Sequence, residues 1–318
     1  MQCCNSCGRM ENMKTGAVII AAGLTSSEEG FQPMKQVGKL TRAERIILNF
    51  QSAGVEDIVI VTGERARELE HTLKQKGAVF LYNQDYRHTE MFDSAKLGFQ
   101  YMEKRCDRIL FTTVNVPLFT EHTVKLLLKS RAPIAIPVYQ GRRGHPVMLQ
   151  SGTLEKIMAY TGKGGLRMAI EASGYQVDWV ETADPGILKQ KGGTEEYGRI
   201  LEQHNRQLLH VDLEIGLVRE KRFFDGETEA LLVQIELTGS VREACRRLNI
   251  SYSRGLRMLE GAEEELGFAL TQRRQGGTGG GQTSLTREGK LFLERYAVFR
   301  QELYRIAEEK FRELRREL

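Results

Sequence analysis

The sequence predicts an α/β protein of two domains, in which a doubly wound, mostly parallel sheet precedes a smaller domain of helices and one β-ribbon. Short β-rich runs alternate with helical stretches from Thr15 to about Gln207, which is typical of βαβ units with helices on both faces of a sheet. This alternation ends near residue 208, where helices begin to follow one another directly. The length of 318 residues suffices for two domains of roughly 100–200 residues each.

The first domain is expected over residues 15–208. Runs rich in Val, Ile and Phe predict strands at 17–22, 57–62, 78–82, 108–114, 133–139 and 176–181. Apolar residues at helical spacing predict helices at 42–53, 64–76, 94–104, 121–129, 153–160, 165–173 and 194–207. Ligands bind beyond the carboxyl ends of parallel strands, so we expect the site near Gly23, Asn115 and the loops after Tyr139 and Glu181.

The second domain is expected over residues 209–318. An alternating run predicts a hairpin at 211–224, and helical patterns follow at 227–237, 241–248 and 251–266. Ser240 is a good N-cap for the second of these helices. A β-ribbon at 269–274 and 283–286 brackets a glycine-rich loop, and a final helix runs from 287 towards 318. This order predicts a winged helix-turn-helix domain.

Composition excludes several classes of protein but does not indicate a partner. No apolar run approaches the roughly 20 residues that span a bilayer, and no secretory signal is present, so we expect a cytoplasmic protein. The net charge is +4, from 46 basic and 42 acidic residues. Residues 210–318 hold 19 of each sign, so only local clusters of charge can argue for DNA binding.

The extreme N-terminus is expected to be a flexible leader over residues 1–14. Cys4 and Cys7 have the C-x-x-C spacing of a zinc or redox half-site, with Cys3 beside them. A closed zinc site takes four ligands and no second pair follows, so we favour the leader over a metal site. Cys106 and Cys245 stand in apolar surroundings and are expected to be core thiols.

Arginines of the second domain gather where a helix-turn-helix protein contacts DNA. They lie on both helices of the motif and on the ribbon, whose glycines allow a close approach to phosphate. Thr286 is expected to cap the helix after the ribbon, whose free N–H groups suit a phosphate oxygen. The candidate DNA-binding residues are Arg242, Arg246, Ser251, Tyr252, Ser253, Arg254, Arg257, Arg273, Arg274, Gly277 and Gly280.

Residues 211–305 resemble the DNA-binding domain of molybdate-dependent transcriptional regulators (ModE type), which is related to LysR-type winged helices. The resemblance rests on Thr238-Gly-Ser240, Glu243-Ala244, Ser251-Tyr252, Arg274-Gln-Gly-Gly277, Gly279-Gly-Gly281 and Leu285-Thr-Arg-Glu-Gly289. It implies double-stranded DNA as a partner and a homodimer formed partly through the last helix, with Phe292, Tyr296, Phe299, Leu303, Ile306 and Phe311 as apolar positions. The molybdate-binding domains of that family would follow this one, so direct molybdate sensing by that route is not expected.

Residues 17–207 resemble the Rossmann-like nucleotidyltransferase domain of molybdenum-cofactor cytidylyl- and guanylyltransferases (MobA-like). The resemblance rests on Val18-Ile-Ile-Ala-Ala-Gly23, Phe31-Gln-Pro-Met34, Ala43-Glu-Arg-Ile46, Glu90-Met-Phe-Asp-Ser94, Pro117-Leu118, Gly144-His-Pro-Val147, Gly162-Lys-Gly-Gly165 and Asp184-Pro-Gly-Ile187. The pair Gly-His-Pro-Val and Gly-Lys-Gly-Gly indicates the cytidylyltransferase branch. A fold like that of nucleotide-diphospho-sugar transferases is implied.

The catalytic positions that the family implies are occupied by other residues. An Arg, a Gly, a Lys, an Asp and an Asp-x-Asp of the family correspond to Ser27, Glu29, Gln32, Asn115 and Gln190/Gly192. Cations for the triphosphate and carboxylates for Mg²⁺ are therefore replaced, although Lys35 or Lys39 would be able to compensate locally. Ligand binding is expected to survive through Ala21, Ala22, Gly23, Asn115, Arg142, Arg143, His145 and Lys163.

These observations lead to one hypothesis and two alternatives. The first is a DNA-binding regulator of molybdenum-cofactor metabolism, with an inactive transferase-fold domain that senses a small anionic ligand, either a nucleotide or a pterin. The second is an active transferase that uses CTP or GTP with Mg²⁺. The third is a scaffold for partner proteins with no DNA role.

Overall fold

The computed structural model describes residues 13–23, 30–73, 76–190, 192–248, 250–274 and 282–317. The chain divides into two compact units, Met1–His210 and Val211–Leu318, and each is described by itself. The predicted site residues Ser27, Glu29, Gly277 and Gly280 lie outside the described residues, as does most of the expected leader. Among the helices described, none is long and apolar enough to cross a membrane.

The first unit is built on an eight-stranded sheet in which β10-β7-β9-β6-β1-β4-β5 is the order of neighbours and β8 pairs with β7. The strands are β1 (Thr15–Ala21), β4 (Asp57–Thr62), β5 (Ala78–Tyr82), β6 (Arg108–Thr113), β7 (Ile134–Tyr139), β8 (Arg142–Arg143), β9 (Val147–Gln150) and β10 (Val177–Glu181). Strand β1 pairs in parallel with β4 and β6, β4 with β5, and β7 with β10. The predicted mostly parallel sheet is confirmed.

The sequence pattern did not predict β9, which runs antiparallel between β6 and β7. Its apolar core is only Val147 to Leu149, too short to be told from a loop. The sequence pattern also did not predict a small hairpin of β2 (Gln36–Val37) with β3 (Leu40–Thr41). Gly38 sits in its turn at φ 67°, the left-handed region that glycine adopts at no steric cost.

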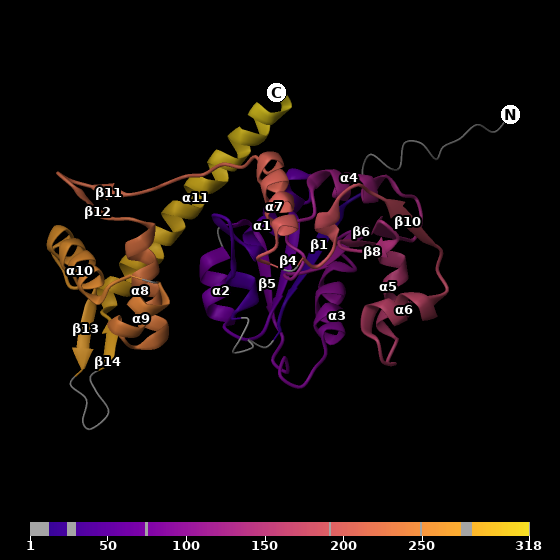
Figure 1. Cartoon of the computed structure of the whole chain (residues 1–318). Coiled ribbons are helices and arrows are strands. Elements are labelled where there is room, and N and C mark those ends of the chain that lie inside the picture. The colour runs from indigo at the N-terminus through magenta and orange to yellow at the C-terminus, as the bar shows by residue number, and fades with distance from the viewer. Residues whose placement is uncertain are drawn as a thin grey trace. The chain divides into compact units, whose positions relative to one another are not determined.

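Helices cover both faces of this sheet (Figure 1) because alternate residues of each buried strand face opposite sides. Ile19 of β1 belongs to an apolar cluster with residues of α1 (Arg42–Ser52), α2 (Ala66–Leu73) and α4 (Glu121–Lys129). Its neighbour Val18 belongs to a second cluster, with residues of α3 (Met91–Met102), α5 (Leu154–Met158) and α6 (Gly165–Ser173). Helix α2 is shorter than the predicted 64–76, since Arg65 has a positive φ of 54° that a helix does not contain.

The last helix of the first unit, α7 (Glu195–Gln207), is held to α1 by a buried polar network. His204 Nδ1 lies 3.0 Å from Arg45 Nη1, and its Nε2 lies 3.2 Å from the Phe119 carbonyl. Arginine only donates and a carbonyl only accepts, so Nδ1 accepts and the ring proton sits on Nε2. Burial and the nearby Arg45 charge lower the pKa of His204 to about 4.

The second unit has the predicted order of elements. A short hairpin, β11 (Leu217–Val218) with β12 (Arg222–Phe224), precedes the helices α8 (Gly226–Thr238), α9 (Val241–Arg247) and α10 (Tyr252–Leu266). The ribbon β13 (Thr271–Arg274) with β14 (Gln282–Leu285) follows, and then the long helix α11 (Arg287–Glu317), which Figure 1 shows leading to the C-terminus.

Local signals in the sequence set the ends of these helices. The Ser240 hydroxyl accepts from the Glu243 amide and so caps α9 as predicted, while Gly239 ends α8 in the left-handed region. The Thr286 hydroxyl accepts from the Gly289 amide at the start of α11. The helices α9 and α10 and the ribbon of β13 and β14 therefore form a winged helix-turn-helix.

Tyrosines of α11 bind the backbone that leads into this unit. Tyr296 Oη donates to the Ile215 carbonyl at 2.9 Å, and Tyr304 Oη donates to the Leu213 carbonyl at 2.8 Å. Tyr296 and Phe292 also pack on Phe224, which places these two rings of α11 in the core of their own unit. These two predicted dimer positions are therefore used inside the unit.

Candidate functional site: two joined cavities and a basic helix pair

A crevice of about 350 Å³ opens at the carboxyl ends of β1 and β6. It brings together Gly23 and Asn115, which were predicted to meet because both follow strands, with the predicted ligand residues Ala21 and Ala22 and the replaced catalytic position Gln32. Further residues of its wall are Ile20, Phe31, Pro33, Tyr86, Arg87, Thr89, Met91, Ser94, Thr113 and Val114. The crevice thus lies where an open parallel sheet places its ligand.

Arg42, at the start of α1, joins two of the replaced catalytic positions. Its Nη1 donates to Asn115 Oδ1 at 3.1 Å and to Gln32 Oε1. Lys35 and Lys39, which the sequence offered as compensating cations, are both exposed, and neither lines the crevice. Arg42 is instead a cation beside the crevice. Its contact with Asn115 joins residues 73 positions apart, which the local sequence pattern does not reveal.

The residues present do not fit the Mg²⁺ ion that the fold would imply. Magnesium takes oxygen ligands, normally including one or two carboxylates. No group of three His, Cys, Asp or Glu side chains that would hold a metal occurs among the described residues, and the crevice wall they form includes no Asp or Glu. Asn115 offers a neutral oxygen, and Arg42 already donates to it. The donor set at this end of the crevice is therefore a poor one for a divalent cation.

Arg87 contributes a second positive charge, directly on the crevice wall. Its Nε donates to Tyr86 Oη at 3.0 Å, and its guanidinium lies 5.5 Å from the centre of the Tyr86 ring. This contact raises the pKa of Arg87 further above its ordinary value, so the side chain is a permanent cation. The sequence pattern did not indicate Arg87 because it lies in a turn, outside the matching motifs.

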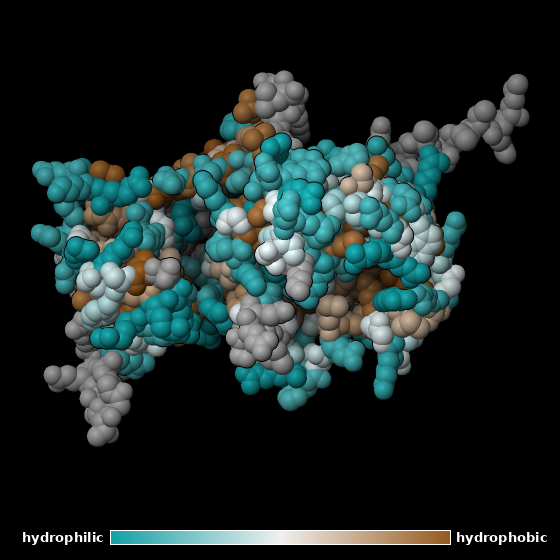
Figure 2. Space-filling model, in the orientation of Figure 1, coloured by the Kyte–Doolittle hydropathy of each residue, from teal (hydrophilic) through white to brown (hydrophobic). Residues whose placement is uncertain are grey.

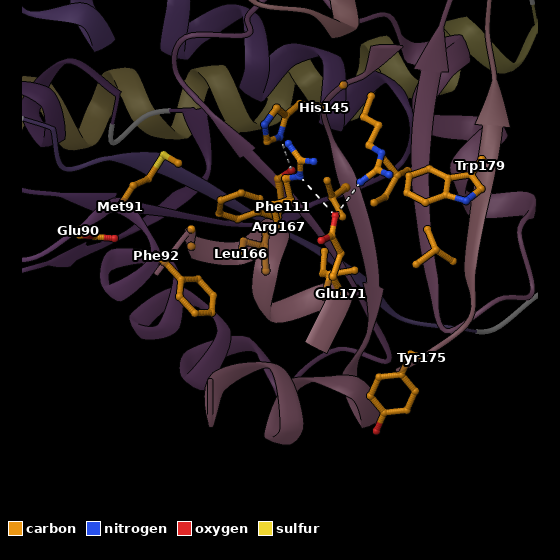
Figure 3. Close-up of a pocket in the computed structure, with 18 residues that line it drawn as sticks. Glu90, Met91, Phe92, Phe111, His145, Leu166, Arg167, Glu171, Tyr175 and Trp179 are labelled. Carbon is orange, nitrogen blue, oxygen red and sulfur yellow. Dashed lines mark hydrogen bonds and ion pairs between the residues drawn. The ribbon is translucent and has the colours of Figure 1, made fainter. Parts of the chain in front are cut away.

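A larger cavity of about 580 Å³, here called the aromatic pocket, lies between α3, β10 and α6. Figure 2 shows a hydrophobic hollow with a hydrophilic rim on this face of the first unit. Phe92, Phe111 and Leu166 lie on one side, Trp179 on the other and Glu171 between them (Figure 3). The other lining residues are Glu90, Met91, Ile136, Arg143, Gly144, His145, Val147, Gly164, Gly165, Arg167, Ile170, Tyr175 and Val177.

An ion-pair cluster forms the polar side of the aromatic pocket. Glu171 Oε1 accepts from Arg143 Nη1 at 3.0 Å and from Arg167 Nε at 3.3 Å (Figure 3). These two hydrogen bonds, of which the one from Arg143 has the larger effect, hold the pKa of the Glu171 carboxyl below its ordinary value. The Arg143 guanidinium also lies 4.3 Å from the centre of the Trp179 ring. A cavity of this size with apolar walls and one polar side is typical of a small-molecule site.

His145 stands at the junction of the two cavities. A third cavity of about 370 Å³ shares Asn115 with the crevice and His145 with the aromatic pocket. Burial lowers the pKa of His145, opposed by a long contact from its Nδ1 to the Phe111 carbonyl, so the ring is neutral near pH 7. The three cavities form one connected surface along the strand ends.

The predicted ligand residue Lys163 and the replaced catalytic position Gln190 lie elsewhere. Lys163 is exposed and its carbonyl accepts from Tyr160 Oη; only its neighbours Gly164 and Gly165 line the aromatic pocket. Gln190 Nε2 donates to the Pro185 carbonyl at 2.6 Å. Asp184, from a motif that carried the resemblance, accepts from Thr120 and Thr123 side chains and so stabilises the start of α4.

The second unit presents a basic surface at the start of α10. Ser251 caps this helix, its hydroxyl accepting from the Arg254 amide at 3.2 Å. Tyr252 is exposed, and the Arg242 guanidinium lies 5.1 Å from the centre of the Tyr252 ring. This contact joins α9 to α10. Ser253 and Arg257 lie one turn apart on the exposed face. The predicted residues of both helices therefore meet on one surface.

Several of these arginines pair with acids. Arg246 and Arg247 both donate to Glu243, and these bonds lower its pKa to about 2. Arg254 Nη2 lies 2.7 Å from Glu227 Oε2 of α8, a partner that the sequence pattern did not indicate. Beyond Arg257 the exposed face of α10 turns acidic, with Glu260 and Glu264 in its later turns. For Arg273 and Arg274, the structure gives the backbone pairing of β13 with β14.

Fold and surfaces together define a nucleotidyltransferase-like domain joined to a helix-turn-helix DNA-binding domain. A model of the MobA-like NTP transferase domain matches residues 17–177, just over half of the chain, and the chain belongs to this family. Residues 230–290 match the bacterial regulatory helix-turn-helix protein model of the lysR family.

Comparison with individual proteins supports the first of these assignments. A nucleotidyl transferase from Methanothermobacter thermautotrophicus superposes with a TM-score of 0.52 at 21% identity, covering 61% of this chain and 99% of that one. Rv0371c from Mycobacterium tuberculosis, solved in complex with manganese, gives 0.50 at 16% identity, with 60% and 98% covered. The bifunctional protein GlmU of Staphylococcus haemolyticus is 25% identical over 119 residues, 37% of this chain and about a quarter (26%) of that protein.

Proposed function

We propose that this protein is a transcriptional regulator linked to molybdenum-cofactor metabolism, in which the first unit senses a ligand and the second binds DNA. The observation that carries the proposal is the joining of a winged helix-turn-helix, whose α9 and α10 present Arg242, Tyr252, Arg254 and Arg257 together, to a transferase fold whose metal position is neutral. Side chains at the start of such a helix reach base edges in the major groove.

Loss of nucleotidyl transfer follows from the charges beside the crevice. Transfer to a phosphate needs preorganised charge for the developing negative oxygens, and the loss of one such contact typically costs about 10²–10³ in rate. Asn115 supplies no negative charge for a metal, and Gln32 no positive charge for a triphosphate. The alternative, an active CTP- or GTP-dependent transferase, is tested by pyrophosphate release with molybdopterin and Mg²⁺. Turnover that Asn115→Ala abolishes would establish it in place of the sensor.

The aromatic pocket is the proposed effector site. Trp179 and Phe92 offer faces for a planar ring, while Arg143 and Arg167 offer donors for an anionic substituent. A pterin with a phosphate group has both features, and so does a nucleotide. The third cavity, lined by both His145 and Asn115, gives one ligand room to extend from this pocket towards the crevice.

The DNA-binding form is proposed to be a homodimer that pairs through α11. Val298, Phe299 and Ile306 on this helix are 56%, 45% and 47% exposed. Large apolar side chains gathered on one helix are a common means of pairing. Of the positions expected from the sequence, Phe299, Leu303, Ile306 and Phe311 remain candidates.

The test is fluorescence anisotropy of the full chain with promoter fragments from its own locus and from molybdenum-cofactor genes, at two stated salt concentrations. Salt is fixed because phosphate contacts make affinity depend steeply on it. We expect one fragment to bind at least about a thousandfold more tightly than unrelated DNA. Equal affinity for every fragment would overturn the regulator, and binding to no fragment would leave the scaffold.

A further inference from the structure

The contact between Arg42 and Asn115 fixes which way the Asn115 amide faces. An arginine carries donors and no acceptor, so the atom of Asn115 that it contacts at 3.1 Å is the oxygen. The amide nitrogen Nδ2 is the other polar atom of this group, and it is the one left for the crevice that Asn115 lines. Asn115 therefore presents N–H donors to a ligand.

Gln32 is oriented by the same arginine. Its Oε1 accepts from Arg42, and its Nε2 donates to the Gly30 carbonyl at 3.2 Å. Both amide oxygens at the replaced positions thus accept from one guanidinium. Acceptors suit a metal ion and donors suit an anion, so the pair of replacements reverses the character of this end of the crevice.

We propose that the crevice binds the phosphate group of a nucleotide without a divalent cation. Asn115 donates from Nδ2 to an anionic phosphate oxygen, and Arg42 is the positioning residue that holds the amide and supplies positive charge from behind the wall. The inference rests on the proposed function, because it takes the first unit as a ligand-binding domain.

The rest of the crevice has the charge this requires. Among the described residues its wall contains Arg87 and no Asp or Glu, so a phosphate there meets an adjacent cation. A divalent cation bound to Asn115 Oδ1 at about 2.1 Å would lie within about 5 Å of Arg42 Nη1, where like charges repel. The surroundings therefore favour an anion over a metal ion.

The first experiment is titration calorimetry of the full chain with CTP and with GTP, each in Mg²⁺ and in EDTA. We expect at least one nucleotide to bind, with dissociation constants that agree within twofold in the two buffers, and inorganic pyrophosphate to compete. Affinity that falls more than tenfold in EDTA would overturn the proposal. Absence of binding by both nucleotides in both buffers would also overturn it.

Substitutions test the separate roles of Arg42 and Asn115 in nucleotide binding. Arg42→Met and Asn115→Asp are each expected to weaken binding in EDTA at least tenfold, the second because a carboxylate repels phosphate. Arg42→Lys keeps the positive charge and is expected to lose less affinity than Arg42→Met. The comparison of these two variants separates the effect of the charge from that of a folding defect. Lys39→Met, an exposed lysine outside the crevice wall, is the matched control. Unchanged affinity in Arg42→Met, or tighter Mg²⁺-dependent binding in Asn115→Asp, would overturn the assignment.

The two proposals fail separately. Specific DNA binding by the unliganded chain is measured without nucleotide, and its loss would leave the calorimetry unaffected. Conversely, a nucleotide that binds only with Mg²⁺ would overturn the metal-free crevice and leave the regulator in place.

Discussion

Arg254 Nη2 lies 2.7 Å from Glu227 Oε2, so the helix proposed to read DNA is joined to the first helix of its own unit. Both side chains are partly exposed, which makes the pair worth little for stability, with a typical value for such pairs of about 0–1 kcal/mol. Its effect is to hold the Arg254 side chain in one direction before DNA arrives.

Arg254→Ala is expected to weaken specific DNA binding by roughly 1–3 kcal/mol, the usual loss when a base contact is removed. The measurement is anisotropy with the specific fragment at fixed salt. Arg206→Ala is the control, since Arg206 is also exposed and pairs with an acid, Glu202, in the other unit. Equal affinity of the Arg254 variant and the native protein would show that α10 docks in another orientation.

Glu227→Gln is expected to steepen the salt dependence of DNA binding. The change removes the carboxylate that neutralises Arg254, so the surface that meets DNA carries about one more net positive charge, which raises the slope of log affinity against log salt by about 0.9. Titrations at four salt concentrations give this slope. A slope that stays the same would mean that Glu227 does not neutralise Arg254 in the complex with DNA.

Trp179, the one tryptophan of the chain, should report on the aromatic pocket. It is 43% exposed, and its ring faces Arg143. Molybdopterin is expected to quench its fluorescence saturably, and Val147→Phe, which fills the pocket, to abolish that response. Val79→Phe, on the exposed edge strand β5, should respond like the native protein. Quenching that persists in the Val147 variant would place the ligand elsewhere.

His204 is expected to make the first unit lose stability in acid. Its folded pKa of about 4 lies below the ordinary 6.5, so the unfolded chain binds the proton first as pH falls. The free energy of unfolding therefore drops between pH 6.5 and 4, by up to about 3 kcal/mol at 1.36 kcal/mol per pKa unit. His204→Gln should lack this component. Denaturant unfolding followed by Trp179 fluorescence measures it, and identical pH profiles for both proteins would refute it.

Ile306→Glu is expected to raise the dimer dissociation constant at least about tenfold, since loss of one buried apolar side chain exceeds 1.4 kcal/mol. Sedimentation equilibrium measures the constant, and weaker DNA binding should accompany the change. Val218→Glu, at an exposed position on β11, controls for added charge. A native protein that is monomeric at micromolar concentration would rule out pairing through α11.

Features set by neighbouring residues could be predicted from the sequence. The alternation of Val18 and Ile19 between two helix layers follows from the two-residue period of a strand, and Ser240 caps α9 as its side chain indicates. The meeting of Gly23 with Asn115 also follows, since parallel strands end at one edge of a sheet.

Contacts between distant residues could not be predicted. Arg42 meets Asn115 across 73 positions, and Glu227 meets Arg254 across 27, with no local pattern to connect them. The strand β9 is too short to show a period, so its place in the sheet depends on the edges offered by β6 and β7. The sequence indicated which residue types had been replaced, while the structure indicates the direction of their donors.

The change of charge along α10 limits how this helix can meet DNA. Arg254 and Arg257 lie in its first two turns, and Glu260 and Glu264 follow on the exposed face. DNA phosphates repel these acidic turns. The helix must therefore enter the major groove by its N-terminal end rather than lie lengthwise in it. The basic tip, Tyr252 to Arg257, is about 9 Å long at 1.5 Å per residue, which spans about three base pairs at 3.4 Å each. In the proposed homodimer, each copy would therefore read only a short half-site, and a long operator would have to be two such half-sites set apart.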